Sequence, residues 1–142
     1  MFGVLASLVA LSACKAAPKT VILDIVTFNY WNRPIFDVFI NGIWGGSSTA
    51  YPATGGGTIV GVSMLLGPQT VTWRLDGKAG TPRNGETVTA KNKPVLADVP
   101  RDATCLSVHV YPDETVELIP TVYYPSETEK GKVMALAAGA TR

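Results

Sequence analysis

The chain has 142 residues with 12 basic and 11 acidic side chains, so its net charge is only +1 at pH 7. This balance gives no electrostatic basis for binding nucleic acid or a strongly anionic surface. The length predicts one domain, large enough to form a core without structural disulfides or metals.

Residues 1–13 have no charged side chain, and 2–11 form an apolar run. This run is too short to cross a bilayer, which needs about 20 apolar residues, but it suits the apolar region of an export signal. Leu11, Ser12 and Ala13 precede Cys14, and this pattern matches the lipobox of bacterial lipoproteins. We therefore expect a signal peptide at 1–13, with cleavage before Cys14 and lipid attachment to its thiol. A lipoprotein with two or three acyl chains would stay on the membrane.

Two other interpretations of this segment are an ordinary secretory cleavage site and a buried N-terminal strand, but neither explains a cysteine at this place. The basic residue that usually begins a signal peptide is absent, so we expect the true start codon to lie upstream of Met1. Lys15 follows the cysteine. Because Asp at that place is typical of inner-membrane retention in Gram-negative bacteria, we expect the periplasmic face of the outer membrane. Acylation of Cys14 would leave Cys105 without a disulfide partner, as a buried or free thiol.

A short lipidated tether at 14–19 leads into a β domain at 20–125, and a tail occupies 126–142. Short β-rich runs separated by Gly, Pro and Asn predict an all-β fold, an antiparallel β-sandwich of about seven strands. The expected strands are 20–29, 35–41, 58–65, 70–75, 86–90, 104–111 and 115–123. In the tail we expect either a short helix at 133–138 or fraying.

Alternation within two of these runs predicts which side chains share a face. In 35–41 it groups Phe36 with Val38 and Ile40, and in 105–111 it separates Leu106, Val108 and Val110 from Ser107, His109 and Tyr111. The sequence Pro112-Asp113-Glu114 predicts a turn that joins the last two strands as a hairpin.

Catalytic and metal-binding patterns are weak, and we predict no enzyme, no cofactor and no metal site. His109, the single histidine, shares a face with Ser107, but residues two apart on a strand lie about 6–7 Å apart, beyond hydrogen-bond reach. We therefore expect His109 to face solvent or a neighbouring strand. The triplet at 55–57 lacks the Lys-Ser/Thr ending of a phosphate loop, and no small-molecule ligand is predicted.

A protein-binding surface is the remaining functional prediction. The segment 42–57 is long for a connection in a compact β domain, and it carries Trp44 and Tyr51 among small residues. With Tyr30, Trp31 and Arg33 from the preceding turn, these residue types are typical of binding hot spots. The alternative for Trp31 and Trp44 is that each closes an end of the sandwich. Trp73 is expected in the core or in cross-strand packing.

Motifs in a fixed order add a family resemblance that covers about residues 20–125. They are FNYWNRPI (28–35), VFINGIWGG (38–46), GGG (55–57), VTW (71–73) and LSVHVYPD (106–113). In this order they resemble the bacterial lipoproteins of domain-of-unknown-function family 3304. The chain departs from that family at 59–62, where Ile-Val-Gly-Val stands in place of a Cys-Cys-Val strand, so no role of those cysteines is carried over.

Lipoproteins of that family are often encoded beside phospholipase effectors of type VI secretion. The resemblance therefore implies an immunity protein of the periplasm that binds and neutralises a cognate secreted lipase. The alternative is a structural or accessory lipoprotein of the envelope or of the secretion system, without an inhibitory role.

Overall fold

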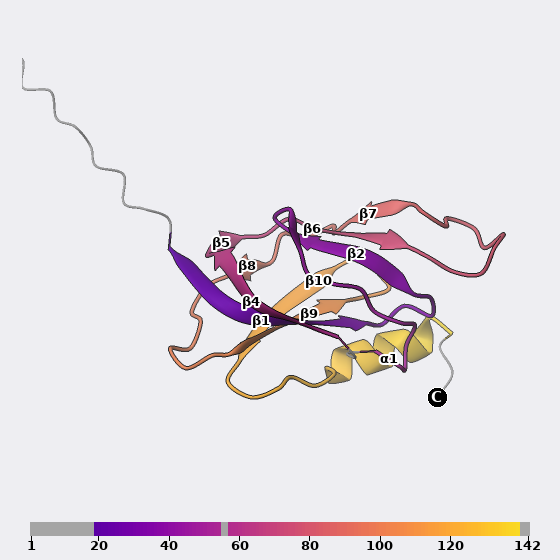
Figure 1. The fold of residues 1–142 in the computed structure, drawn as a ribbon. Helices are drawn as coiled ribbons and strands as arrows, with labels where there is room; N and C mark the ends of the chain where they lie inside the picture. Colours follow the sequence, from indigo (N-terminus) through magenta and orange to yellow (C-terminus); the bar gives the residue numbers. More distant parts are fainter. Residues whose placement is uncertain (1–18, 55–56, 140–142) are drawn as a thin grey trace, which may run out of the picture.

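The computed structural model describes residues 19–54 and 57–139, which form two facing four-stranded sheets (Figure 1). The first sheet, in the order β10-β9-β1-β4, contains β1 (Thr20–Asn29), β4 (Thr58–Leu65), β9 (Cys105–Val110) and β10 (Val116–Thr121). The second, in the order β3-β2-β6-β7, contains β2 (Ile35–Ile40), β3 (Ile43–Trp44), β6 (Val71–Leu75) and β7 (Thr87–Thr89). A small pair consists of β5 (Gly67–Pro68) and β8 (Val95–Leu96), and one helix, α1 (Glu129–Ala137), follows.

The all-β sandwich prediction is confirmed, and two long strands have the expected bounds, 20–29 and 58–65. The hairpin of β9 and β10 is also confirmed, with Val110 opposite Val116. The sequence did not predict β3, β5 and β8, which have two residues each. It also did not predict that β1 pairs with β9 in parallel, whereas the other strand pairs of the described residues are antiparallel.

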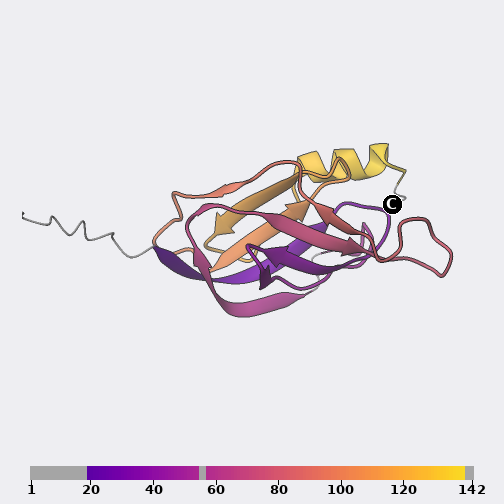
Figure 2. The same ribbon diagram turned by 90° about the horizontal axis from the view of Figure 1, so that it is seen from above.

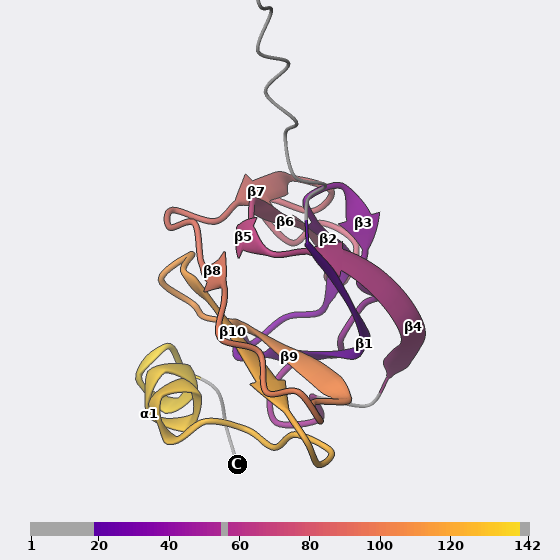
Figure 3. The ribbon, with the colours of Figure 1, turned by 90° about the vertical axis from the view of Figure 1, so that its left-hand side faces the viewer.

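The main core lies between the two sheets, which face one another when the molecule is viewed end-on (Figure 3). Trp73 on β6 is fully buried there, as expected, and its ring packs edge-on against Trp31 at a centroid distance of 6.3 Å. Leu106, Val108 and Val110 reach the same core from β9. The burial of these large apolar side chains provides the main driving force for folding.

A bulge in β2 overturns the expected alternation of that strand. Phe36 lies opposite Arg74 and Phe39 opposite Thr72, so β2 has one more residue than β6 over this stretch. The extra residue is accommodated at Asp37, whose φ is +47°, and the bulge reverses the faces of the residues before it. Phe36 is therefore exposed, whereas Val38 and Ile40 are buried.

A second apolar cluster lies on the other side of the first sheet, beneath α1. It consists of Val26, Phe28, Tyr30, Tyr111 and Ala135. Figures 2 and 3 show α1 on the outside of this sheet, beside β10. All of β9 is buried because one of its faces meets the main core, while α1 and the segment 122–128 cover the other.

The helix begins at Glu129, earlier than the expected 133, because Thr128 caps it. The Thr128 hydroxyl accepts a hydrogen bond from the backbone N–H of Gly131 at 3.0 Å. Gly131 lies directly on Tyr30, and a Cβ at this position would be 2.2 Å from Cζ of that ring. Glycine therefore permits a closer contact between helix and sheet than any other residue.

Candidate functional site

The five residues predicted to bind a partner do not form one surface. Tyr30 and Trp31 are buried, at 0% and 9% exposure, in the cluster beneath α1 and in the main core respectively. Tyr51 is half-buried, with its ring centroid 6.0 Å from that of Tyr30. Trp44 is the one of the four aromatic residues that is well exposed, at 48%. Arg33 has a different position and role.

Arg33 holds the long loop between β6 and β7. Its Nε and Nη1 donate to the carbonyl oxygens of Asp76 and Pro82, both at 2.8 Å, and its Nη2 donates to Oδ1 of Asn84 at 2.7 Å. The planar guanidinium is thus used in three directions at once, which a lysine could not reproduce. Its geometry indicates a structural role in this loop.

Trp44 belongs to an exposed aromatic face on the outside of the second sheet. We use the name aromatic face for Phe36, Phe39 and Trp44, which are 37%, 36% and 48% exposed. Phe39 lies opposite Trp44 on one side and opposite Thr72 on the other, so these side chains point the same way. Neither phenylalanine is among the binding residues predicted from the sequence. For Phe36 the reason is the bulge at Asp37, which the alternation does not reveal, whereas Phe39 lies beyond the bulge, on the face opposite Val38 and Ile40 that the alternation gives it.

One ion pair borders the aromatic face. Nη2 of Arg74 lies 2.8 Å from Oδ2 of Asp37, and the guanidinium lies 6.0 Å from the centre of the Phe36 ring. Both charged side chains are about half exposed. Beside them Phe36 and Pro34 line a hollow of about 340 Å³. The combination of aromatic rings, an arginine and a neighbouring hollow is typical of protein-binding hot spots.

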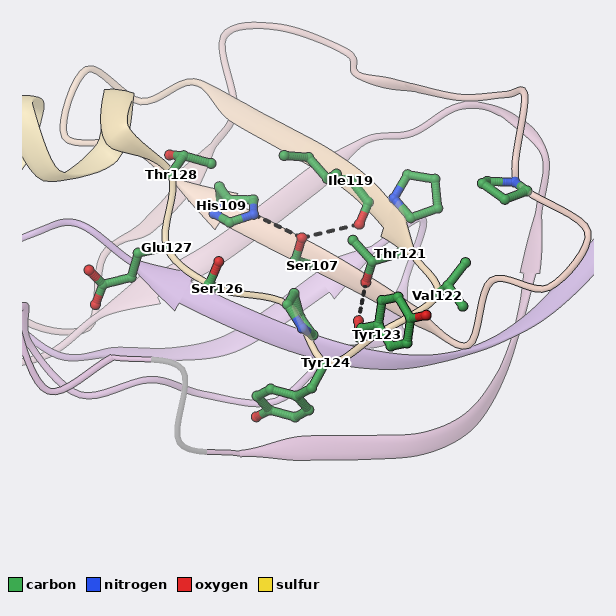
Figure 4. Close-up of a pocket in the computed structure, with 13 residues that line it drawn as sticks. Ser107, His109, Ile119, Thr121, Val122, Tyr123, Tyr124, Ser126, Glu127 and Thr128 are labelled. Carbon is green, nitrogen blue, oxygen red and sulfur yellow. Dashed lines mark hydrogen bonds between the residues drawn. The ribbon is translucent and has the colours of Figure 1, made fainter.

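A chain of buried hydrogen bonds lies on the outer face of the first sheet, beneath the segment that leads to α1 (Figure 4). Oγ of Ser107 donates to the carbonyl of Ile119 at 3.1 Å and lies 2.8 Å from Nε2 of His109. Because that hydroxyl proton is committed to the carbonyl, Nε2 of His109 is the donor to Ser107, and Nδ1 is left as an acceptor. Nδ1 lies 2.9 Å from the hydroxyl of Tyr30, which therefore donates to it.

Tyr30 extends this chain to the start of α1. Its hydroxyl oxygen accepts a hydrogen bond from the backbone N–H of Thr128 at 2.8 Å. Burial lowers the pKa of His109 to about 4 and raises that of Tyr30, so both groups are neutral at pH 7. A neutral imidazole with one donor and one acceptor nitrogen satisfies the whole chain, which joins β9, β10, β1 and α1.

This arrangement decides between the two positions expected for His109 and corrects its expected separation from Ser107. The imidazole is 1% exposed and stacks on the ring of Phe28 at a centroid distance of 5.0 Å, so it faces the neighbouring strand β1 and not solvent. It also bonds to Ser107, because two side chains on one face of a strand can lean toward each other although their Cα atoms are far apart. The serine hydroxyl is itself 1% exposed and is bonded to a carbonyl. Activation of a serine nucleophile requires an imidazole that accepts the serine proton. Here the imidazole donates to the serine instead.

A cavity of about 590 Å³ lies above these groups. Its floor includes Ser107 and His109, and its walls come from β10 and from the segment that leads to α1 (Figure 4). Tyr123, Pro120 and Pro125 make much of this wall apolar. Ser107 and His109 on its floor already bond to each other, whereas Ser126 and Glu127 add a hydroxyl and a carboxylate to its walls.

Within residues 19–54 and 57–139, no three His, Cys, Asp or Glu side chains gather in a way that could hold a metal ion. In the same residues, no helix is both long enough and apolar enough to cross a bilayer. Cys105 is free and buried, as one of the two expectations had it. Cys14 lies outside the described residues, and its lipid attachment stays a prediction.

Comparisons of the chain with protein-family models, with curated proteins and with solved structures found no match. The resemblance to the lipoprotein family therefore rests on the motifs in the sequence.

Proposed function

We propose that this chain is a lipid-anchored protein of the bacterial envelope that binds a partner protein through its aromatic face and performs no catalysis of its own. The observation that carries the binding role is the group of three exposed rings, Phe36, Phe39 and Trp44, on neighbouring strands of a rigid sheet. Rings on rigid strands lose little conformational entropy on binding, and they supply much of the energy of protein interfaces.

More specifically, the partner would be a phospholipase effector of type VI secretion, which the protein would neutralise at the periplasmic face of the outer membrane. Its support is the lipobox that ends at Cys14, together with the ordered motifs that resemble the lipoprotein family. A lipid anchor would hold the inhibitor beside the phospholipid on which such an enzyme acts.

Co-expression with a type VI phospholipase effector tests this proposal, and an effector encoded in a neighbouring reading frame is the first candidate. The full chain should co-purify with the enzyme and abolish its phospholipase activity. Replacing Trp44 with Ser should weaken the complex by about 2 kcal/mol, which corresponds to a dissociation constant about 30-fold higher. Val133→Ser is the matched control, because Val133 is 65% exposed on α1, over the other sheet.

A lipase that remains fully active with the wild-type chain would contradict the inhibitory role. The alternative, a structural or accessory lipoprotein, predicts that deletion of the gene weakens secretion and leaves self-intoxication unchanged. If Trp44→Ser and Val133→Ser weaken the complex equally, the aromatic face is not the binding surface.

A further inference from the structure

Exposed apolar side chains gather at the end of the sandwich where β1 begins, here called the N-terminal end. Ile22 is 68% exposed, Leu65 45%, Val95 61% and Tyr123 84%. They come from four separate segments, namely β1, β4, β8 and the turn after β10. Exposed apolar side chains contributed by several segments to one end of a domain indicate a contact surface.

Strand pairing places these segments together. Thr20 lies opposite Leu65 and Ile22 opposite Ser63, so Ile22 and Leu65 are diagonal neighbours on the outer face of the first sheet. The backbone N–H of Leu66 donates to the carbonyl of Lys19 at 3.0 Å, which fixes the place where the chain enters the fold.

The other two side chains reach the same end through their own strands. Val95 lies opposite Pro68, and β5 directly follows the end of β4. Thr121, two residues before Tyr123, pairs with Cys105 at the start of β9, which lies beside Asp24 of β1. Figure 1 shows β5, β8 and the beginning of β1 together at the end from which the chain leaves toward its N-terminus.

From these positions we propose that the N-terminal end rests on a phospholipid surface, with Ile22, Leu65 and Val95 at the acyl boundary and Tyr123 at the level of the headgroups. This inference depends on the proposed acylation of Cys14. Lys19 follows Cys14 by five positions, and an extended chain covers at most about 3.6 Å per residue, so Lys19 lies within about 18 Å of the anchored residue. Tyrosine is enriched at the membrane interface because its ring is apolar and its hydroxyl is polar.

The charges near this end favour an apolar rather than an electrostatic contact. Lys19 and Lys93 are exposed there, and the loop after β8 carries Asp98, Arg101 and Asp102. Because both signs are present, attraction to anionic lipid is weak, and we expect the contact to persist at high salt.

This orientation leaves the partner surface accessible. The aromatic face belongs to β2 and β3 of the second sheet, whereas none of the four side chains proposed to contact lipid belongs to that sheet. The membrane would therefore hold the domain upright without covering Trp44.

A fluorescent probe on the acylated full-length protein tests the contact. Val95→Cys and, as a matched control, Val133→Cys are labelled with the environment-sensitive fluorophore NBD in a Cys105→Ala background. Each protein is incorporated into vesicles of phosphatidylethanolamine and phosphatidylglycerol. Spin-labelled lipids should quench the probe at position 95 several-fold more strongly than the probe at 133, at both low and high salt.

A triple variant with Ile22→Ser, Leu65→Ser and Tyr123→Ser should lose this quenching at position 95, while Phe39→Ser should retain it. Mass spectrometry of the same samples reports whether Cys14 is acylated. If the protein is acylated and the probes at 95 and 133 are quenched equally, the lipid contact is overturned and the partner-binding proposal stands. An unmodified Cys14 overturns the lipid contact together with the anchoring on which it depends.

Discussion

The hydroxyl of Tyr30 lies 2.9 Å from Nδ1 of His109, although the two residues are 79 positions apart in the sequence. This bond joins the residue after β1 to the outer face of β9 near the end of that strand. The same hydroxyl receives the N–H of Thr128, so a single phenol connects the sheet to the residue that caps α1.

Acid should destabilise the protein through His109. Burial lowers its pKa from 6.5 to about 4 in the folded state, so the unfolded chain binds the proton first as the pH falls. The stabilisation is complete above pH 6.5 and is lost as the pH falls from 6.5 to 4, by about 3 kcal/mol. Urea unfolding at several pH values measures it.

The His109→Gln variant isolates this contribution, because glutamine retains a donor and an acceptor and does not titrate. Its free energy of unfolding should be lower than that of the wild type at pH 7 and should change less between pH 6.5 and 4. A pH profile identical to that of the wild type would exclude His109 as the source.

Gly131→Ala should loosen α1. The added methyl group would overlap the Tyr30 ring, and overpacking of this kind costs about 1–3 kcal/mol. Hydrogen exchange should become faster in residues 129–137, and the melting temperature should fall. Val133→Ala, on an exposed position of the same helix, provides the control and should leave both unchanged or slightly improved, because alanine is the better helix former.

Thr128→Ala should have a related but smaller effect. It removes the hydroxyl that accepts the Gly131 N–H, at a cost of about 1 kcal/mol, and leaves the backbone donor to Tyr30 in place. Thr128→Ser keeps the capping oxygen and should be close to the wild type. If serine is as destabilising as alanine, capping is not the reason for the loss.

Arg33→Lys should release the loop between β6 and β7 while keeping the charge. A lysine cannot bond to Asp76, Pro82 and Asn84 together, so we expect faster hydrogen exchange at 77–85 and a loss of about 1–2 kcal/mol. Partner binding should be retained, because these bonds are internal. A strong loss of binding with an unchanged loop would assign Arg33 to the interface instead.

Truncation of Trp31 should destabilise the protein far more than truncation of Trp44. Trp31 packs against Trp73, so Trp31→Ala should cost about 3–5 kcal/mol of folding free energy. Trp44→Ser should change the melting temperature little, since the ring is half exposed. Thermal unfolding of the two variants, measured side by side, separates the structural tryptophan from the candidate binding one.

The strands could be predicted from sequence because runs of β-branched and aromatic residues between turn residues report directly on local structure. The faces could be predicted only where the strand is regular, as in β9. In β2 the positive φ of Asp37 shifts the alternation, and no residue type in that strand indicates a bulge. As a result the alternation grouped Phe36 with the buried Val38 and Ile40, and of the aromatic face only Trp44 was predicted from the sequence.

The role of His109 could not be predicted because its burial depends on a segment that follows β10 in the sequence. Alternation correctly separated Ser107, His109 and Tyr111 from the main core, but it could not show that residues 122–137 would cover them. The helix contributes few large apolar side chains, and its docking depends on a glycine at one contact with Tyr30.

The parallel pairing of β1 with β9 has a consequence for the order of folding. Among the described strands β1 comes first in the chain, yet its edge from Asp24 to Asn29 has no partner strand until residues 105–110 are present. Contacts between distant parts of a chain slow folding. Under the proposed export from the N-terminus onward, most of the chain would therefore cross the membrane before β9 could pair with β1 and complete the first sheet.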